Sequence, residues 1–115
     1  MGVHMQGVTA DLSRVCLGTA EFGSRIAQEQ AFRLLDAYVA RGGSFIDTAH
    51  IYAAWLPGGC GASERTVGEW LRVSGASDCV VVATKGGHPP LDAMDVGRCS
   101  KEDIAQDLAE SLERL

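Results

Sequence analysis

Residues 43–52 read Gly-Ser-Phe-Ile-Asp-Thr-Ala-His-Ile-Tyr, and residues 44–47 within this stretch predict a short strand that emerges at the carboxylate of Asp47. The preceding residues 28–41 carry apolar side chains at the i, i+3, i+4 and i+7 spacing of one helix face. These side chains are Ala31, Leu34, Leu35 and Tyr38. A glycine pair at 42–43 then ends the helix, because glycine adopts the left-handed C-cap conformation without a steric penalty.

The same alternation of strand and helix extends in both directions from this stretch. An apolar run over residues 13–18 predicts an earlier strand, and the β-branched run over residues 79–85 predicts a later strand that is buried on both faces. One helix is expected to begin at Ser63 as its N-cap, and another at Ser100, which has capping-box spacing to Asp103. The last helix carries an apolar stripe formed by Ile104, Leu108, Leu112 and Leu115.

Two α/β folds accept this alternation, a doubly wound open sheet and a (β/α)₈ TIM barrel. The open sheet would carry a G-x-G-x-x-G fingerprint, but after Gly59 and Gly61 the third position holds Glu64, and no strand precedes them. A barrel accounts better for polar residues at successive strand ends. We therefore expect residues 1–115 to form an incomplete domain, which supplies about the first three βα units of a TIM barrel.

Composition and charge narrow the classes of partner and the compartment. The chain has 115 residues and a formal net charge of −5 without a run of like charge, so no nucleic-acid or anionic-membrane surface is expected. Its first residues lack the pattern of a secretory signal, and no apolar window is long enough to cross a bilayer, so neither a signal peptide nor a membrane span is expected. Four cysteines without a C-x-x-C pair are expected to be reduced thiols, with neither a zinc site nor a disulfide. The expected compartment is the cytoplasm.

Candidate chemical groups follow each predicted strand. Gly18 and Thr19 come after the first strand, Asp47 ends the second, Lys85 ends the third, and Tyr52 lies five residues beyond Asp47. The carboxyl ends of all strands in a parallel barrel lie at the same mouth of the barrel, so these residues are expected to lie close together. A tyrosine hydroxyl beside a lysine cation and a carboxylate can donate a proton to a carbonyl oxygen while a hydride reaches the carbon.

Each of these residues also has a purely structural interpretation. An aspartate at a strand end is more often a cap or an ion-pair partner than a catalyst, and a lysine there is usually a solvated terminus. A tyrosine in a loop usually packs with its hydroxyl in water. Their joint placement at one rim raises the functional interpretation to equal standing with the structural one.

Five segments of the chain resemble the aldo-keto reductase family, and they occur in the order of that family. Residues 43–52 resemble the signature around the catalytic aspartate and tyrosine. Residues 61–64 with Gly68 are similar to the G-x-S-E-x-x-x-G segment that opens the second helix, and residues 81–86 resemble the strand that ends in the catalytic lysine. The remaining similar segments are residues 17–19 and 110–115.

The resemblance implies an NAD(P)H-dependent oxidoreductase that reduces aldehyde and ketone carbonyls to alcohols, with NADPH or NADH as cofactor and a small-molecule carbonyl compound as substrate. It implies that Tyr52 is the proton donor, that Lys85 is the cation favouring its phenolate, and that Asp47 is the partner of Lys85. It also implies that Gly18, Thr19 and Asp47 bind near the nicotinamide ribose. The family does not use the dinucleotide fingerprint that is missing here.

Two departures from the family pattern stand out. The fourth catalytic residue of the family is a histidine at the end of the fourth strand, and this chain ends before that strand. His88 follows Lys85 too closely to replace it, and His50 belongs to the segment between the aspartate and the tyrosine. The short N-terminal hairpin of the family is expected to be reduced or missing, because residues 6–12 show little strand alternation.

Three strands cannot close into a barrel, so the third strand is expected to leave an open edge and some helix faces uncovered. We accordingly expect the chain to be a fragment, inactive on its own. Self-association through the open edge is the other expectation.

Two alternative functions remain open at this stage. One is a cofactor-binding partner subunit without significant turnover. The other is a metal-dependent barrel hydrolase that uses Asp47, His50 and His88, although a convincing third ligand on another strand end is missing.

Overall fold

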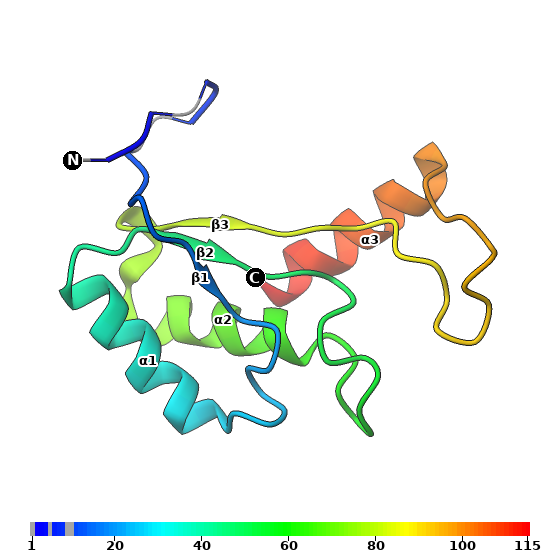
Figure 1. Ribbon diagram of the computed structural model, residues 1–115, viewed down its shortest axis with the longest axis horizontal. Helices are drawn as coiled ribbons and strands as arrows, with labels where there is room; N and C mark the ends of the chain where they lie inside the picture. Colours follow the sequence, from blue (N-terminus) through cyan, green and yellow to red (C-terminus); the bar gives the residue numbers. More distant parts are fainter. Residues whose placement is uncertain (1, 5, 9–10) are drawn as a thin grey trace.

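The computed structural model describes residues 2–4, 6–8 and 11–115. The described residues confirm the predicted alternation of three strands and three α-helices, with one additional short 3-10 helix (Figure 1). In chain order the elements are β1 (Leu17–Gly18), α1 (Gln28–Ala40), β2 (Phe45–Asp47), α2 (Ala62–Ser74), η1 (Ala76–Asp78), β3 (Val81–Ala83) and α3 (Lys101–Arg114).

The three strands form one parallel sheet in the order β1-β2-β3. Gly18 lies opposite Asp47 in the register of β1 and β2, and Asp47 lies opposite Ala83 in the register of β2 and β3. Parallel strands that follow one another through helical crossovers are the repeating unit of a (β/α)₈ barrel. Because all three strands point the same way, their carboxyl ends meet at one edge of the sheet.

The hydrophobic core lies between the sheet and the helices α1 and α2, which run along the same face of the sheet (Figure 1). Its buried members are Phe22, Ala31, Leu35, Ile46, Val67 and Trp70. The indole N–H of Trp70 in α2 donates to the carboxylate of Asp36 in α1 at 2.8 Å, which satisfies the polar atom of a side chain that is otherwise buried. The third helix, α3, packs against α2.

The first strand is shorter than the predicted strand over residues 13–18. Only Leu17 and Gly18 pair with β2, because the residues before them bond to side chains. The Ser13 N–H donates to the Ser44 hydroxyl at 2.8 Å, and the Tyr38 hydroxyl donates to the Val15 carbonyl at 2.6 Å. Residues 13–16 therefore lie outside the sheet ladder, with bends at residues 14 and 15, a difference that the apolar pattern alone could not reveal.

The two predicted helix starts have different outcomes. The capping box at Ser100 is confirmed, because its hydroxyl accepts from the Asp103 N–H and the Asp103 carboxylate accepts from the Ser100 N–H. The N-cap at Ser63 is wrong. The residue that precedes α2 is Gly61, which has a φ of 69° and makes no side-chain cap. Ser63 lies inside the first turn, where its hydroxyl bonds across to the sheet.

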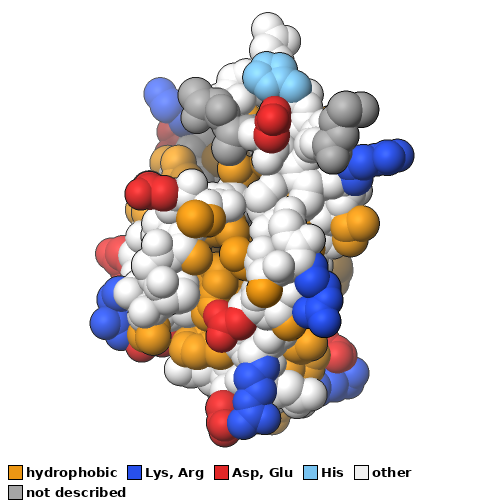
Figure 2. Space-filling model, turned by 90° about the vertical axis from the view of Figure 1, so that its left-hand side faces the viewer, with side chains coloured by type: hydrophobic (Ala, Val, Ile, Leu, Met, Phe, Trp, Pro, Cys, Tyr) orange, Lys and Arg blue, Asp and Glu red, His pale blue; other side chains and the backbone are white. Residues whose placement is uncertain are grey.

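Three of the four residues in the predicted apolar stripe of α3 face solvent, whereas the fourth, Leu115, packs against the core. Ile104, Leu108 and Leu112 are 41%, 53% and 70% exposed, whereas Asp107 and Ser111 are buried. Leu34 of α1, expected on the inner face of that helix, is also exposed. Figure 2 shows the side of the molecule that lies at the left in Figure 1, and on this side hydrophobic side chains also gather between charged ones. Uncovered apolar helix faces agree with the expectation for three βα units of a larger barrel.

The N-terminal segment retains one element of a hairpin. Val3 and Leu12 form an isolated antiparallel bridge, with N–H to carbonyl distances of 2.6 and 3.0 Å. Residues 9 and 10 of the predicted featureless stretch lie outside the described residues. Within the described ranges no helix is both long and apolar enough to span a membrane.

Candidate active site

The three predicted catalytic residues come together at the carboxyl edge of the sheet. Asp47 is the last residue of β2, and Lys85 follows the end of β3. The Lys85 ammonium lies 2.9 Å from Oδ2 of Asp47 and 3.0 Å from the hydroxyl oxygen of Tyr52. The Tyr52 hydroxyl in turn lies 3.3 Å from the same Asp47 oxygen. The spatial part of the prediction is therefore met, and the catalytic roles stay predictions.

Backbone pairing beyond the ends of the strands fixes Lys85 against the loop after β2. The Thr48 N–H donates to the Ala83 carbonyl at 2.9 Å, and the His50 N–H donates to the Lys85 carbonyl at 3.0 Å. The Lys85 ammonium also donates to the Thr48 carbonyl at 2.7 Å. Together with Asp47 and Tyr52, this carbonyl occupies the three donors of the ammonium group. The position of the Lys85 charge is thus defined by three contacts.

Tyr52 lies in a compact series of turns. Its N–H donates to the Ala49 carbonyl at 3.1 Å, and the next residue, Ala53, is wholly buried with a φ of 68°. A side chain at Gly59 would collide with the Ala53 carbonyl oxygen, so the glycine allows the loop to fold back on itself. The Lys85 ammonium lies 4.5 Å from the centre of the Tyr52 ring. The loop therefore presents both the hydroxyl and one ring face to this cation.

The electrostatics of the cluster favour a charged lysine. Partial burial by itself lowers the pKa of Lys85, but its hydrogen bonds with Tyr52 and Asp47 outweigh that effect and raise its pKa above the ordinary value. The side chain of Lys85 is 51% exposed and that of Asp47 is 31% exposed. Both groups are consequently accessible from solvent at the rim while they remain bound to each other.

Gly18 and Thr19, the predicted cofactor contacts, lie beside Asp47 in two different environments. Gly18 is exposed, and a Cβ built on it would meet no atom within 4 Å. Thr19 is wholly buried, and both its N–H and its hydroxyl donate to the Asp47 carbonyl, at 3.0 and 2.9 Å. The space in front of Gly18 is open, whereas the Thr19 side chain is buried and its hydroxyl forms hydrogen bonds inside the protein.

Ser63 has a role that the sequence interpretation missed. Its hydroxyl donates to the Thr19 carbonyl at 2.7 Å and accepts from the Thr48 hydroxyl at 2.9 Å. All three side chains are 0% exposed. They connect the ends of β1 and β2 to the first turn of α2. The serine of the G-x-S-E segment was the available signal, but it was interpreted as a helix cap.

The residues of the alternative metal site do not converge. The Nε2 atom of His50 lies 2.6 Å from a carboxylate oxygen of Glu110, and Nδ1 of His88 lies 2.6 Å from the Pro89 carbonyl. In the portion of the chain that the structure describes, no group of three or more His, Cys, Asp or Glu side chains is arranged to hold a metal ion.

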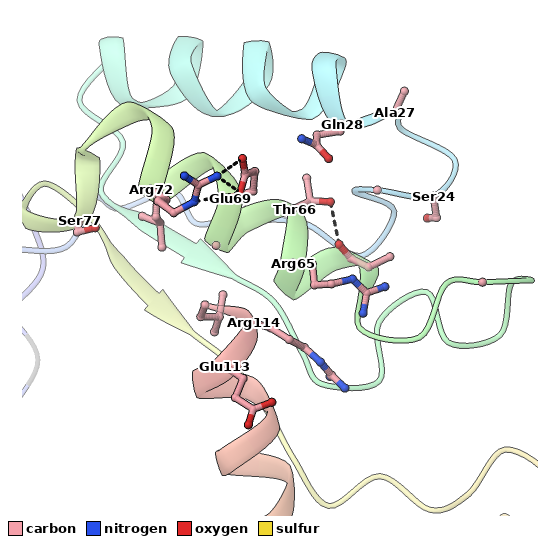
Figure 3. Close-up of a pocket in the computed structure, with 16 residues that line it drawn as sticks. Ser24, Ala27, Gln28, Arg65, Thr66, Glu69, Arg72, Ser77, Glu113 and Arg114 are labelled. Carbon is pink, nitrogen blue, oxygen red and sulfur yellow. Dashed lines mark hydrogen bonds and ion pairs between the residues drawn. The ribbon is translucent and has the colours of Figure 1, made fainter.

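A separate groove of about 970 Å³ runs along α2, between residues 23–28 and the last turn of α3 (Figure 3). Its lining includes Arg65, Thr66 and Glu69 but none of Asp47, Tyr52 and Lys85. The groove is therefore no part of the cluster at the strand ends.

Comparison with known proteins gives consistent matches. The model of the aldo/keto reductase family matches residues 14–115. A norsolorinic acid reductase of Emericella nidulans is 40% identical over 81 residues, which are 64% of this chain and 19% of that protein. An uncharacterized 11.2 kDa protein of Pseudescherichia vulneris is 41% identical over 90 residues, 76% of this chain and 87% of that protein.

Among solved structures, the holo form of an aldo-keto reductase from Bacillus halodurans superimposes with a TM-score of 0.76 and 24% identity. The match covers 99% of this chain and 36% of that one. The chain thus spans about a fifth of the length of the fungal reductase and about a third of the solved barrel.

Proposed function

Because the chain belongs to the aldo/keto reductase family, we propose that it supplies the first part of an NAD(P)H-dependent oxidoreductase that reduces aldehyde or ketone carbonyls to alcohols. The family contains oxidoreductases, among them the norsolorinic acid reductase of Emericella nidulans. The observation that carries the proposal is the cluster in which the Lys85 ammonium touches both Tyr52 and Asp47.

Tyr52 is the proposed proton donor to the carbonyl oxygen of the substrate. As its proton leaves, negative charge develops on the phenol oxygen, and the ammonium of Lys85 lies 3.0 Å from that oxygen. A cation at this distance stabilises the phenolate and so eases the transfer. Asp47 would keep the ammonium charged and oriented, because its carboxylate lies 2.9 Å from Nζ.

The rim fits a nicotinamide cofactor, which would be NADPH or NADH and would supply the hydride. Gly18 leaves open space next to Asp47, since no atom lies within 4 Å of a Cβ built there, and Asp47 is partly exposed. Gly18 and Asp47 would therefore meet the cofactor directly. Thr19 would contribute by holding the Asp47 carbonyl from the buried side.

The proposal assigns turnover to a complete barrel and little or none to these 115 residues alone. Both histidines beyond β2 are engaged elsewhere, His50 with Glu110 and His88 with the Pro89 carbonyl, so neither replaces the family's histidine at the fourth strand. The proposed compartment is the cytoplasm, which is supported by four cysteines that are exposed free thiols.

The experiment is NADPH oxidation with a reactive aldehyde, measured on the complete coding product and on the 115-residue chain. Tyr52→Phe is expected to lower the turnover of the complete protein by about 10²- to 10⁴-fold, the usual contribution of a general acid. Tyr38→Phe is the matched control, because its hydroxyl bonds to Ser13, to Val15 and to the backbone of Phe45, at the opposite end of β2 from Asp47. Turnover should survive that change.

Three other results would change the assignment. Full turnover in Tyr52→Phe would exclude this tyrosine as the proton donor. Turnover by the short chain that depends on Tyr52 would contradict its proposed inactivity. Cofactor binding by the complete protein without reduction of any aldehyde would favour a partner subunit that binds cofactor without turning it over.

A further inference from the structure

The first turn of α2 contains a carboxylate that is wholly buried. Glu64 is 0% exposed, and each of its oxygens has one partner. One oxygen accepts from the Thr84 hydroxyl at 2.6 Å, and the other accepts from the Arg114 guanidinium at 3.0 Å. A buried charge is tolerated only with such partners. Since Thr84 directly precedes Lys85, this carboxylate holds the backbone from which Lys85 projects.

The same guanidinium reaches the segment that precedes Tyr52. Figure 3 shows the Arg114 side chain extending from the last turn of α3 toward the segment that follows β2. One of its nitrogens donates to the Glu110 carboxylate at 3.2 Å, and the other lies 3.5 Å from the His50 carbonyl. His50 stands two residues before Tyr52, and its own ring lies 2.6 Å from the same Glu110 carboxylate.

Charge in this network is complementary. The hydrogen bond from His50, followed by that from Gln106, lowers the pKa of Glu110, so the carboxylate is ionised at neutral pH and can only accept. The proton in the bond to His50 therefore belongs to Nε2 of the imidazole. Glu64 and Glu110 are thus two carboxylates bridged by one guanidinium, with Thr84 at one end and His50 at the other.

Thr84, at one end of this network, is next to Lys85, and His50, at the other end, is two residues before Tyr52. The proposed reaction needs the contact between Lys85 and Tyr52. Tyr52 and Lys85 belong to different segments and meet at 3.0 Å, and the Lys85 side chain is half exposed. The distance between them depends on how the two segments are held. We propose that Glu64, Arg114 and His50 are positioning residues, which act through α3 to keep the Tyr52 hydroxyl against the Lys85 ammonium. The inference rests on the proposed function, in which that contact is required.

The test measures the contact itself and needs no turnover. Tyrosine labelled with ¹³C at Cζ gives one resonance for Tyr38 and one for Tyr52, which Tyr52→Phe assigns. Lys85→Met removes the cation, so its effect on the Tyr52 shift reports how close the two side chains are. Arg114→Met is expected to reduce that effect by at least half, and Arg114→Lys to restore part of it.

Two controls separate positioning from general stability. Arg33→Met breaks an exposed ion pair with Glu29 on α1, and it should leave the effect of Lys85→Met unchanged. Thr84→Val is the second variant, for use if Arg114→Met does not fold, because it removes one hydrogen bond to Glu64 and keeps the ion pair with Arg114. It should also reduce the change in the Tyr52 shift that Lys85→Met causes. The Tyr38 resonance should not respond to Lys85→Met in any background.

An undiminished effect of Lys85→Met in folded Arg114→Met, or in Thr84→Val, would overturn the inference and leave the network a structural one only. This outcome is independent of the reaction. If the complete protein failed to reduce carbonyls while Arg114→Met still weakened the contact, the proposed function would be wrong and the positioning network would stand.

Discussion

At the scale of single residues, a glycine without a side chain is as important to this molecule as the residues that carry chemical groups. Gly68 lies where the last turn of α3 crosses α2, and a Cβ there would overlap the carbonyl oxygen of Arg114 and lie 2.9 Å from Cα of Leu115. The close approach lets Arg114 reach Glu64, which is one helical turn before Gly68. The glycine that the family segment carries at this position thus has a packing reason.

Gly68→Ala is expected to lower the free energy of unfolding by about 1–3 kcal/mol, since an added methyl group must push α3 away from α2. Gly97→Ala is the matched control, because a Cβ there meets no atom within 4 Å and the residue has no positive φ. The control should change stability by less than about 0.5 kcal/mol. Urea unfolding followed by circular dichroism measures both. Equal midpoints for Gly68→Ala and the unchanged chain would refute the packing argument.

At the scale of elements, α3 is held by polar contacts more than by apolar ones. Its buried residues are Asp107 and Ser111, whereas the apolar side chains of Ile104, Leu108 and Leu112 face solvent. The Asp107 carboxylate accepts from the Arg98 guanidinium at 2.7 Å and from the Gly87 N–H at 2.8 Å. Burial alone raises the pKa of Asp107, but these two bonds and nearby charges lower it overall. The carboxylate thereby ties α3 to the loop that follows β3.

This arrangement predicts that the chain loses stability in acid. A carboxyl group whose pKa is lower in the folded chain takes up its proton more readily when unfolded, so its contribution is present at neutral pH and is lost as the pH falls below about 4. Asp107→Asn should be less stable at pH 7 and should lose less of its remaining stability between pH 5 and pH 3. Urea midpoints across that range provide the measurement. Parallel pH profiles for the two proteins would exclude Asp107 as a source of the acid sensitivity.

At the scale of the whole molecule, the sheet has an open side. The Val81 N–H donates to the Ser44 carbonyl and the Ala83 carbonyl accepts from the Thr48 N–H, both toward β2. Val82 therefore directs its backbone N–H and carbonyl to the other edge. No strand pairs with that edge in the ranges that the structure describes. An unpaired parallel edge is a template for a further strand.

We propose that the isolated chain self-associates through this edge of β3. Sedimentation velocity should show a mass that rises with concentration. Val82→Pro removes the outward N–H and leaves the bonds of Val81 and Ala83 toward β2, so it should shift the protein toward monomer. Val82→Ala keeps the N–H and should still associate. A chain that stays monomeric at every concentration, or a proline variant that associates equally well, would exclude the edge as the interface.

Much of the fold and of the candidate catalytic cluster could be predicted from the sequence, because both depend on local patterns. Helical spacing in residues 28–41, the β-branched run before Lys85 and the capping box at Ser100 each lie within one element. Asp47 and Tyr52 lie within one short segment, and parallel strands necessarily bring their carboxyl ends together. These features need no knowledge of distant partners.

Only the tertiary structure decided what the polar residues of α2 do and which face of α3 is buried. Ser63 was expected to cap a helix, yet its partners Thr19 and Thr48 are 44 and 15 residues away. Glu64 is paired with Arg114, 50 residues away. An isolated helix would present these groups to water, and only the packed sheet and α3 surround them with matching donors and acceptors. Local periodicity therefore determined which elements form and where the chemical groups stand, whereas contacts distant in the chain determined what holds those groups in place.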